Sequence, residues 1–529
     1  MGDAIWATKK EKGDAIMTID VQMHHFPLFI DGQWQPASSG ETFNVYNPAT
    51  GEAVATVAKA TADDVDRAVK AARKAFDETD WKAMKPKERA RVLNVIAQAI
   101  AANAQELVYL EAISSGGTIR RISSIDILQT VDLFQTMANI VQEYPFSETL
   151  PIPPFPGPAH NFVWREPIGV CAAITPWNLP LMIASWKIAP ALAAGNTIVV
   201  KPASYTPLST LKLAEIISSF VPPGVINVVA GPGAEVGEAL VRHPQVDKVA
   251  FTGSTEVGRR IMALAAETVK NVTLELGGKS PNILLEDADL DIAVPGSLFG
   301  VFLHSGQLCE SGTRLFVPDR LHDEVVEQLA ALTKTLQIGH PLDPATDVGP
   351  VISKRQKETV LSYIEAGKQE GATIVCGGHE VEVPGCEGGH FVAPTIFSNV
   401  TNDMTIAQEE IFGPVLSVIR YHDVEEAVAM ANDTIYGLAA GVWTRDVNKA
   451  YAIAGRLQAG VVWINDWHML RNDAPFGGYK QSGIGREMGK YSLDAYTQLK
   501  HVHTSMVPEL EKRKWYQVLF SRLHTMMKK

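Results

Sequence analysis

The sequence predicts an α/β protein built on a doubly wound parallel sheet, followed by a second α/β unit. From Val170 onward, short apolar runs alternate with helical stretches, which is the pattern of buried parallel strands joined by crossover helices. These runs lie at residues 197–200, 225–229 and 248–251. The alternation resumes after Pro281, with further apolar runs at residues 283–285, 314–317, 415–419, 439–442 and 461–464.

Ahead of this sheet, the sequence predicts a short strand and a group of helices. Residues 29–34 are typical of a strand and turn, and residues 47–51 contain a second turn signal. A helix is expected to begin at residues 61–64, where two aspartates fall in the first turn. Apolar residues recur at helical spacing from residue 89 to about residue 113, where two glycines follow.

Five prolines crowd residues 151–158. Proline lacks the backbone N–H that a helix interior or a central strand requires, so neither element is expected here. We expect this segment to cross between substructures.

Composition limits the classes of function. A chain of 529 residues has room for about three domains of about 150 residues each. The net charge of −12 argues against a nucleic-acid-binding protein, because no basic excess exists to neutralise phosphates. The four cysteines form no CxxC pair and no Cys/His ligand spacing, so neither a disulfide framework nor a metal site is expected.

The sequence predicts a cytoplasmic protein. No apolar run approaches the roughly 18 residues that a membrane span needs, and the first 25 residues lack the apolar core of a secretory signal. We expect residues 1–25 to form a flexible leader. The absence of paired cysteines agrees with a reducing compartment.

Three short segments contain the residue types of covalent catalysis. Cys309 lies among small, backbone-permissive residues, 34 positions after Glu275. A carboxylate beside a cysteine can activate water for the second half of a covalent cycle. Asn178, in the segment ITPWNLP, supplies an amide that can hold a developing oxyanion. Together these residues indicate an enzyme that passes through a thioester.

Two further segments are typical of phosphate or sugar binding. Residues 251–258, FTGSTEVG, place glycines between a strand and a helix start, where a backbone can approach a pyrophosphate. The spacing is not GxGxxG, so a tight strand-to-helix turn explains this segment equally well when taken alone. Lys201 follows a strand at the sheet edge that binds ligands, although a solvated loop lysine is the simpler interpretation of that residue alone.

Taken together, these segments resemble the aldehyde dehydrogenase superfamily over about residues 29–505. Seven motifs occur in the family's order: ITPWN at 174–178, KPAS at 201–204, FTGST at 251–255, ELGGKSP at 275–281, GQLC at 306–309, EEIFGPV at 409–415 and PFGGYKQSGIGRE at 475–487. The resemblance implies an NAD(P)-dependent enzyme that hydrolyses its thioester rather than transferring the acyl group to CoA.

The resemblance also implies roles for individual residues. Cys309 is expected to be the nucleophile, Asn178 the side-chain donor of the oxyanion hole and Glu275 the general base for deacylation. Lys187 and Glu487 match positions that family members use in a proton path behind that base.

By the same resemblance, NAD or NADP is the expected cofactor. Lys201 and Glu410 are expected to bind the two ribose hydroxyl pairs, Ser254 the pyrophosphate, and Phe412 to pack near the nicotinamide ribose. The remaining residues expected at the cofactor are Ile174, Thr175, Pro176, Trp177, Ala203, Ser204, Gly233, Phe251, Gly253, Leu276 and Gly277.

Two residues depart from the family's pattern. Members that prefer NAD often carry glutamate where this chain has Ser204, so we expect NADP to be tolerated. The residue after the nucleophile, Glu310, is usually small and uncharged in relatives. It can raise the pKa of Cys309 by like-charge proximity or point away from the site, and we favour the second interpretation.

The positions that match the family's aldehyde funnel are almost wholly apolar: Leu179, Ile183, Trp186, Leu308, Trp467 and Leu470. They favour uncharged aliphatic or aromatic aldehydes. Arg471, if it faced inward, would pair with a substrate carboxylate, which keeps oxidation of the succinate-semialdehyde type as the alternative. An inactive structural or binding protein on the same fold is a further alternative, disfavoured because the three catalytic residues are present.

The resemblance implies a division into domains and an oligomer. Residues 26–150 and 169–280 are expected to form a dinucleotide-binding domain, and residues 281–480 a catalytic domain. Residues 151–168 and 481–505 are expected to form a small β segment that joins subunits into a homodimer or homotetramer. Residues 506–529 have the pattern of an amphipathic basic helix, expected to dock on protein in preference to a membrane surface.

Overall fold

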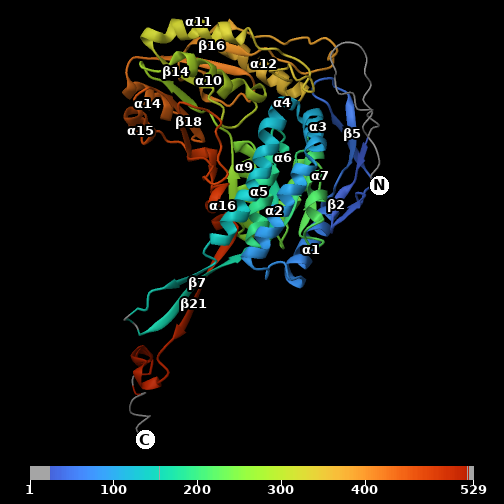
Figure 1. Ribbon diagram of the computed structural model, residues 1–529, viewed down its shortest axis with the longest axis vertical. Helices are drawn as coiled ribbons and strands as arrows, with labels where there is room; N and C mark the ends of the chain where they lie inside the picture. Colours follow the sequence, from blue (N-terminus) through green and yellow to red (C-terminus); the bar gives the residue numbers. More distant parts are fainter. Residues whose placement is uncertain (1–23, 154, 156, 521, 523–529) are drawn as a thin grey trace.

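The computed structural model describes residues 24–153, 155, 157–520 and 522. Two lobes, each built on its own sheet, lie one above the other, and a narrow arm projects from the lower lobe (Figure 1). Most of the predicted leader and the end of the predicted tail fall outside the described residues. None of the helices in the described residues is long and apolar enough to cross a membrane.

The lower lobe contains an eight-stranded sheet in the order β20-β12-β11-β8-β9-β10-β2-β3. Its five central strands are parallel, and those that lie innermost are buried along their whole length, which explains the continuous apolar runs in the sequence. The strands are β2 (Leu28–Ile30), β3 (Gln33–Gln35), β8 (Val170–Ile174), β9 (Thr197–Lys201), β10 (Ile226–Val228), β11 (Lys248–Thr252), β12 (Asn271–Glu275) and β20 (Gly483–Ile484).

Helices pack around this sheet, so its predicted α/β class is confirmed. The first helix begins at the predicted position, where Asp64 accepts a hydrogen bond from the Thr61 N–H (2.9 Å). The helices of this lobe are α1 (Ala62–Glu78), α2 (Pro86–Ala102), α3 (Ala104–Ser115), α4 (Ile119–Arg121), α5 (Ile127–Glu143), α6 (Pro180–Ala194), α7 (Leu208–Ser218), α8 (Glu238–Arg242), α9 (Thr255–Ala265) and α16 (Gly489–Ala495). The helical stretch predicted from residue 89 is therefore two helices, separated at Asn103.

The upper lobe contains a seven-stranded sheet in the order β15-β16-β17-β14-β13-β18-β19. All neighbouring pairs are parallel except β15 with β16. The strands are β13 (Pro281–Leu284), β14 (Arg314–Pro318), β15 (Thr373–Cys376), β16 (Thr395–Val400), β17 (Val415–Tyr421), β18 (Ala439–Trp443) and β19 (Val461–Ile464). The helices are α10 (Leu290–Phe302), α11 (His322–Thr333), α12 (Lys354–Gln369), α13 (Thr405–Gln408), α14 (Val424–Asn432) and α15 (Val447–Ala454).

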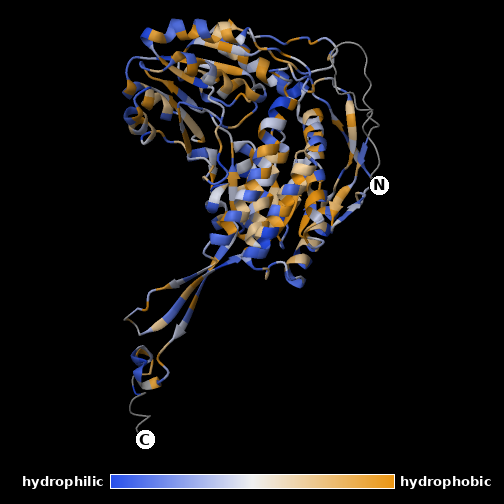
Figure 2. Cartoon of the chain, viewed as in Figure 1, coloured by the Kyte–Doolittle hydropathy of each residue, from blue (hydrophilic) through white to orange (hydrophobic). Residues whose placement is uncertain are grey.

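The arm is a three-stranded antiparallel sheet of β6 (Ser147–Leu150), β7 (Ala159–Pro167) and β21 (Thr497–Ser505), in the order β21-β7-β6. The proline-rich segment joins β6 to β7 inside this sheet, so the prediction that it crosses between substructures is wrong. The arm also starts earlier than residue 151 and returns later than residue 481, because β20 belongs to the eight-stranded sheet. Hydrophilic and hydrophobic residues are mixed along the arm (Figure 2). A small separate sheet near the start of the described chain consists of β1 (His24–Phe26), β4 (Thr42–Tyr46) and β5 (Ala53–Ala58).

The tail differs from the single helix that its sequence pattern predicts. Its described part forms two 3-10 helices, Leu510–Lys512 and Lys514–Val518, interrupted at Arg513. There the guanidinium donates to the Val507 carbonyl (2.9 Å), and the backbone leaves the helical region. The amphipathic-helix prediction is therefore wrong over residues 510–518.

Candidate functional site

The loop that carries Cys309 lies beside the end of strand β8. Asn178 follows that strand and is buried, and its Nδ2 donates to the carbonyl of Gln307 (2.8 Å). The amide is thus held against the backbone of the cysteine loop, and it has a second N–H to donate. Cys309 itself is half-buried. A sulfur nucleophile and an amide donor in this arrangement can form and stabilise a tetrahedral adduct.

Glu275 ends strand β12 and is almost completely buried. Within the described chain, neither of its carboxylate oxygens has a hydrogen-bond partner. Its side chain lies against Gly477, where a Cβ would come within 2.6 Å of Oε1. Burial, followed by the nearby Glu487 carboxylate, raises the pKa of Glu275 well above its ordinary value. Such a carboxyl holds its proton more tightly than usual, as a general base for water at neutral pH requires.

A buried ion pair stands behind Glu275. Lys187 of helix α6 donates to the Glu487 carboxylate, and both side chains are buried. The Glu487 backbone pairs with that of Phe476 (Glu487 N to Phe476 O, 2.7 Å). The Glu487 charge raises the pKa of Glu275, and the Lys187 charge lowers it. The structure therefore brings together the two residues expected in a proton path and couples them electrostatically to the expected base.

The expected cofactor residues of the lower lobe gather at one edge of its sheet, at the carboxyl ends of parallel strands. Lys201 ends β9 and donates to the Pro202 carbonyl (3.0 Å), and burial lowers its pKa to about 8. Ser204 lies in the following loop, where its hydroxyl donates to the Gly231 carbonyl (2.8 Å). Ser254 caps helix α9 by accepting from the Val257 N–H (3.4 Å).

The other expected residues occupy the same edge. Ile174, Thr175, Pro176 and Trp177 follow or end β8, Ala203 and Gly233 lie in the loops after β9 and β10, and Phe251, Gly253, Leu276 and Gly277 lie at the ends of β11 and β12. This edge is where open α/β sheets bind dinucleotides. The hydroxyl of Thr175 is buried without a hydrogen-bond partner in the described chain, and nothing approaches the position of a Cβ at Gly233 within 4 Å. These residues fit a dinucleotide: an open backbone, a free buried hydroxyl and a helix N-terminus lie along one edge.

Glu410 reaches this edge from the upper lobe. The Gly278 N–H donates to its Oε1 (3.1 Å), and a Cβ at Gly277 would lie 2.1 Å from Oε2, so only glycine leaves room for the carboxylate. Burial raises the pKa of Glu410 to about 7. Phe412 stands edge-on to Trp177, with ring centroids 5.2 Å apart. The two lobes thus meet around the segment that follows Glu275.

A cavity of about 660 Å³ adjoins the Cys309 loop, and the two sequence neighbours of Cys309, Leu308 and Glu310, lie in its wall. Three of the expected funnel residues, Leu179, Leu308 and Leu470, lie in its wall. The other three are packed elsewhere in the core: Ile183 on the buried face of α6, Trp186 against Phe476, and Trp467 against Trp463. Sequence reasoning missed the apolar wall residues Met182, Phe299 and Leu303, although Met182 lies one helical turn after Leu179 and Leu303 one turn after Phe299.

Arg471 also lines this cavity, but its guanidinium is engaged outside it. Arg471 donates to Asp473 through Nη2 (2.7 Å) and Nε (2.9 Å), and its side chain is 73% exposed. Arg471 therefore presents no inward charge to a substrate carboxylate, and the other arginine in the wall, Arg121, is paired with the buried Asp126 (Nη2 to Oδ2, 3.1 Å).

The prediction that Glu310 points away from the site is wrong. Instead of pointing away, its side chain is buried beside the nucleophile, where Oε2 accepts a hydrogen bond from the Cys309 thiol (Sγ to Oε2, 3.2 Å). The other oxygen, Oε1, lies 2.9 Å from His468 Nδ1. His468 comes from a loop 158 residues later, so no local pattern signals the contact.

The pKa shifts of this cluster follow from burial and from its hydrogen bonds. Burial alone would raise the pKa of Glu310, but the hydrogen bond and charge of His468 hold it below its ordinary value. Burial and the adjacent Glu310 carboxylate raise the pKa of Cys309 well above that of a free thiol. The sulfur is therefore protonated at neutral pH in the free enzyme.

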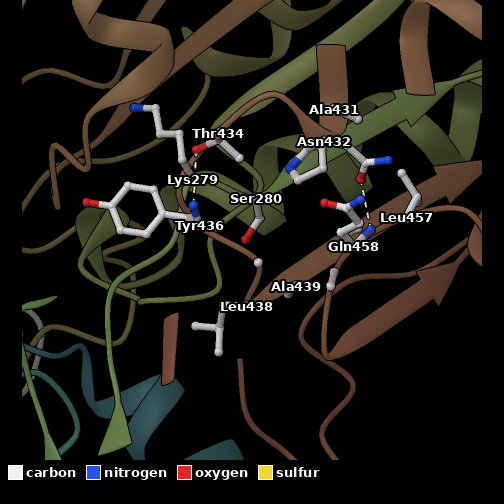
Figure 3. Close-up of a pocket in the computed structure, with 14 residues that line it drawn as sticks. Lys279, Ser280, Ala431, Asn432, Thr434, Tyr436, Leu438, Ala439, Leu457 and Gln458 are labelled. Atoms are coloured by element: carbon white, nitrogen blue, oxygen red, sulfur yellow. Dashed lines mark hydrogen bonds between the residues drawn. The ribbon is translucent and has the colours of Figure 1, made fainter. Parts of the chain in front are cut away.

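A second, much smaller cavity lies at the end of the Glu275–Pro281 segment, where Lys279 and Ser280 form part of its wall. Figure 3 shows Asn432 and Gln458 on one side of it and Lys279 with Tyr436 on the other. Its volume is about 10 Å³, enough for about one water molecule and too small for a substrate. Among the described residues, no group of three or more His, Cys, Asp or Glu side chains is placed to hold a metal ion.

Comparison with known proteins shows that enzymes have similar sequences and similar structures. The profile of the aldehyde dehydrogenase family matches residues 34–502. Betaine aldehyde dehydrogenase of Bacillus subtilis is 45% identical over 91% of this chain and 98% of its own length. Retinal dehydrogenase 2 of Homo sapiens is 43% identical over 93% of this chain and 94% of its own length. The NAD⁺ complex of an aldehyde dehydrogenase from Bacillus cereus has a TM-score of 0.88 at 45% identity, covering 91% of this chain and 97% of that one.

Proposed function

The chain belongs to the aldehyde dehydrogenase family and is an NAD-dependent aldehyde dehydrogenase, and we propose that its substrates are uncharged aliphatic or aromatic aldehydes. The observation that carries this proposal is the wall of the cavity beside Cys309. Leucine, methionine and phenylalanine side chains form much of this wall, next to the neighbours of Cys309 in sequence, Leu308 and Glu310. Of the two arginines in the wall, Arg471 is paired with Asp473 and Arg121 with Asp126.

We propose the following division of work among the residues. The Cys309 sulfur attacks the aldehyde carbon, and Asn178 Nδ2 with the Cys309 N–H donates to the resulting oxyanion. NAD, when bound, would supply the acceptor for the hydride that leaves the substrate carbon. Glu275 then removes a proton from the water that hydrolyses the thioester, and Lys187 with Glu487 adjusts the affinity of Glu275 for that proton.

We propose that Lys201 and Glu410 hold the two riboses of the cofactor, with Ser254 and the N-terminus of α9 at the pyrophosphate. The lobe on the eight-stranded sheet is then the cofactor lobe, and the lobe on the seven-stranded sheet carries the nucleophile. NADP tolerance is part of this proposal, because Ser204 presents no negative charge to a 2′-phosphate.

Oxidation of the succinate-semialdehyde type is the second candidate. A substrate carboxylate would enter a cavity that contains the Glu310 carboxylate and no free inward cation from Arg471. Like-charge repulsion in a buried site opposes that substrate. The names of the two relatives give different aldehydes, so family membership does not select between these candidates.

A panel of aldehydes tests the substrate class. The purified enzyme would be assayed with linear aliphatic aldehydes, benzaldehyde and succinate semialdehyde, each with NAD and with NADP, by absorbance of the reduced nicotinamide. We expect kcat/KM to be highest for the uncharged aldehydes. A higher kcat/KM for succinate semialdehyde that is lost in Arg471→Gln would contradict the proposal.

We further propose that the arm joins subunits into a homodimer or homotetramer. Leu499 on β21 is 71% exposed and Trp164 on β7 is 40% exposed, so the arm offers apolar surface next to unpaired strand edges. Light scattering on the purified chain measures the oligomer directly. A cytoplasmic location stays a prediction from the sequence.

A further inference from the structure

We propose that Glu310 is a further catalytic residue of this enzyme, which takes the thiol proton of Cys309 as the sulfur attacks the aldehyde, and that His468 is the positioning residue that holds it. This inference rests on the proposed role of Cys309 as the nucleophile. Glu310 directly follows the nucleophile, at the position where relatives usually have a small, uncharged side chain.

The geometry singles out Glu310 among the nearby carboxylates. The Cys309 thiol donates to Glu310 Oε2 at 3.2 Å, which is hydrogen-bond distance for a sulfur donor. In the described chain the Glu275 oxygens have no hydrogen-bond partner, so the resting thiol is not bonded to that carboxylate. The bond along which a proton would move is therefore already formed to Glu310 before any substrate enters.

His468 fixes the direction of the carboxylate. Because an ionised carboxylate only accepts hydrogen bonds, the proton of the 2.9 Å contact must be on His468 Nδ1. The imidazole is itself confined: its side chain is 6% exposed, and its ring stands edge-on to Phe299 (5.4 Å) and Trp467 (6.3 Å). Oε1 is thus occupied by the histidine, which leaves Oε2 for the thiol.

The sulfur needs a proton acceptor in contact with it. The site is buried, and the Glu310, Glu410 and Glu275 carboxylates all raise the pKa of Cys309, so little free thiolate exists at neutral pH. A base held against the thiol removes the proton in step with the attack, and no population of free thiolate has to form first.

The step balances without any further reactant. The S–H bond breaks as the S–C bond forms, the carbonyl electron pair moves to the oxygen beside Asn178, and the proton is taken up by Glu310 Oε2. Oxidation of an aldehyde by NAD and water yields the carboxylic acid, the reduced cofactor and one proton, and ionisation of the acid at neutral pH releases a second proton. Glu310 lines the cavity of about 660 Å³, so its proton has a route to solvent.

Other charged groups face the same space and must be considered in any pH profile. Arg121, Asp126, Asp132 and Arg471 line the cavity with Glu310, and Glu275 and Glu410 lie on the opposite side of the sulfur. Glu327 provides a matched control, because Glu327→Gln also neutralises one carboxylate but lies exposed on helix α11, outside the cavity wall.

The test is the pre-steady-state burst of reduced cofactor, which reports acylation, measured against pH in the wild type, Glu310→Gln, His468→Ala and Glu327→Gln. We expect a wild-type burst rate that is independent of pH below the pKa of Cys309. In Glu310→Gln the burst at pH 7 should be about 100-fold slower and should rise tenfold per pH unit. His468→Ala should fall between the two, and Glu327→Gln should keep the wild-type profile.

The rate at which iodoacetamide alkylates Cys309 in the absence of aldehyde distinguishes a loss of catalysis from structural damage around the sulfur. Glu310→Gln removes a negative charge from beside the sulfur, so alkylation at pH 7 should stay equal or become faster while the burst slows. A fall of both rates together, or a Glu310→Gln burst within twofold of the wild type, overturns the inference. If that variant does not fold, a wild-type burst that itself rises tenfold per pH unit overturns it. If Cys309→Ser does not oxidise aldehydes while Glu310→Gln keeps a normal burst rate, the inference about Glu310 fails and the proposed function of the enzyme stands.

Discussion

The two sides of Cys309 each present a buried carboxylate, and their environments differ. On the cofactor side, the Glu275 carboxylate has no hydrogen-bond partner in the described chain, and its pKa is raised. On the substrate side, Glu310 has hydrogen-bond partners on both oxygens, and its pKa is lowered. Burial is nearly equal, at 2% and 4% exposed, so burial does not cause the difference. Hydrogen-bond partners decide which carboxyl keeps its proton.

This difference assigns the two groups to different half-reactions. A carboxyl with a raised pKa accepts a proton from water effectively once it is ionised, which suits hydrolysis of the thioester. A carboxylate that is ionised in the resting enzyme is ready to act when the aldehyde arrives, which suits acylation. In the proposed mechanism, the same residue type therefore serves two steps because two environments surround it.

Removal of the sulfur is expected to have the largest effect, because both carboxylates act through it. Cys309→Ser should lower aldehyde oxidation by at least about a thousand-fold, since a serine hydroxyl is a much weaker nucleophile than a thiolate. NAD binding, followed by fluorescence quenching, should remain within about twofold of the wild type. Appreciable turnover by Cys309→Ser would show that the two carboxylates do not act through the Cys309 sulfur.

Removal of the cofactor-side base separates the half-reactions. Glu275→Gln should keep the burst of reduced cofactor but lower the steady-state rate by about 10²- to 10⁴-fold, because only hydrolysis loses its base. Stopped-flow absorbance measures both phases in one experiment. A normal steady-state rate would show that another group activates the water and would end the assignment of Glu275 to that step.

The pKa of Glu275 gives a pH test with a defined sign. Glu275 acts as a base only when ionised, so the wild-type hydrolysis rate should rise with pH through its raised pKa. Glu487→Gln removes the nearby negative charge and should move this rise to lower pH, whereas Lys187→Met should move it to higher pH. The rate at neutral pH should change by no more than about tenfold in either variant.

Protein stability is the control measurement for the variants Glu487→Gln and Lys187→Met. Each variant leaves one buried charge without its partner, at a cost of about 3–5 kcal/mol in the free energy of unfolding, so melting temperatures must be measured alongside. A shift of both pH profiles in the same direction would mean that structural damage, rather than charge, controls the hydrolysis rate.

Sequence reasoning was effective where the fold imposes a periodic or contiguous pattern. The buried central strands of the eight-stranded sheet produce continuous apolar runs, and the motif residues at their carboxyl ends meet at one edge because parallel strands end together. The contacts of Glu310 could not be predicted in this way. Its partner His468 arrives from a distant loop, and a side chain's rotamer depends on that partner rather than on its neighbours in sequence.

The funnel and the tail were predicted less well for a related reason. Trp186 follows the cavity residue Met182 by four positions, and Trp467 directly precedes the cavity residue His468. Both nevertheless pack inward, Trp186 against Phe476 and Trp467 against Trp463. Apolarity shows that a side chain avoids water and does not show which apolar surface it meets. In the tail, helical spacing predicted a helix, and the Arg513 contact with the Val507 carbonyl interrupts it.

The smallest expected effect lies on the cofactor side, at the end of the site remote from the sulfur. Ser204→Glu should raise the KM for NADP about tenfold and leave kcat with NAD nearly unchanged, because a carboxylate there repels a 2′-phosphate and does not touch Cys309. Ser204→Gln is the matched control, since it adds the same volume without the charge. Steady-state kinetics with both cofactors measures the ratio of kcat/KM values. An equal loss with NADP in both variants would show that volume rather than charge excludes the phosphate. The burst in the presence of NAD should keep the wild-type pH profile in both variants, because the charge on Glu310, on the other side of the sulfur, is set by His468 and not by the ribose site.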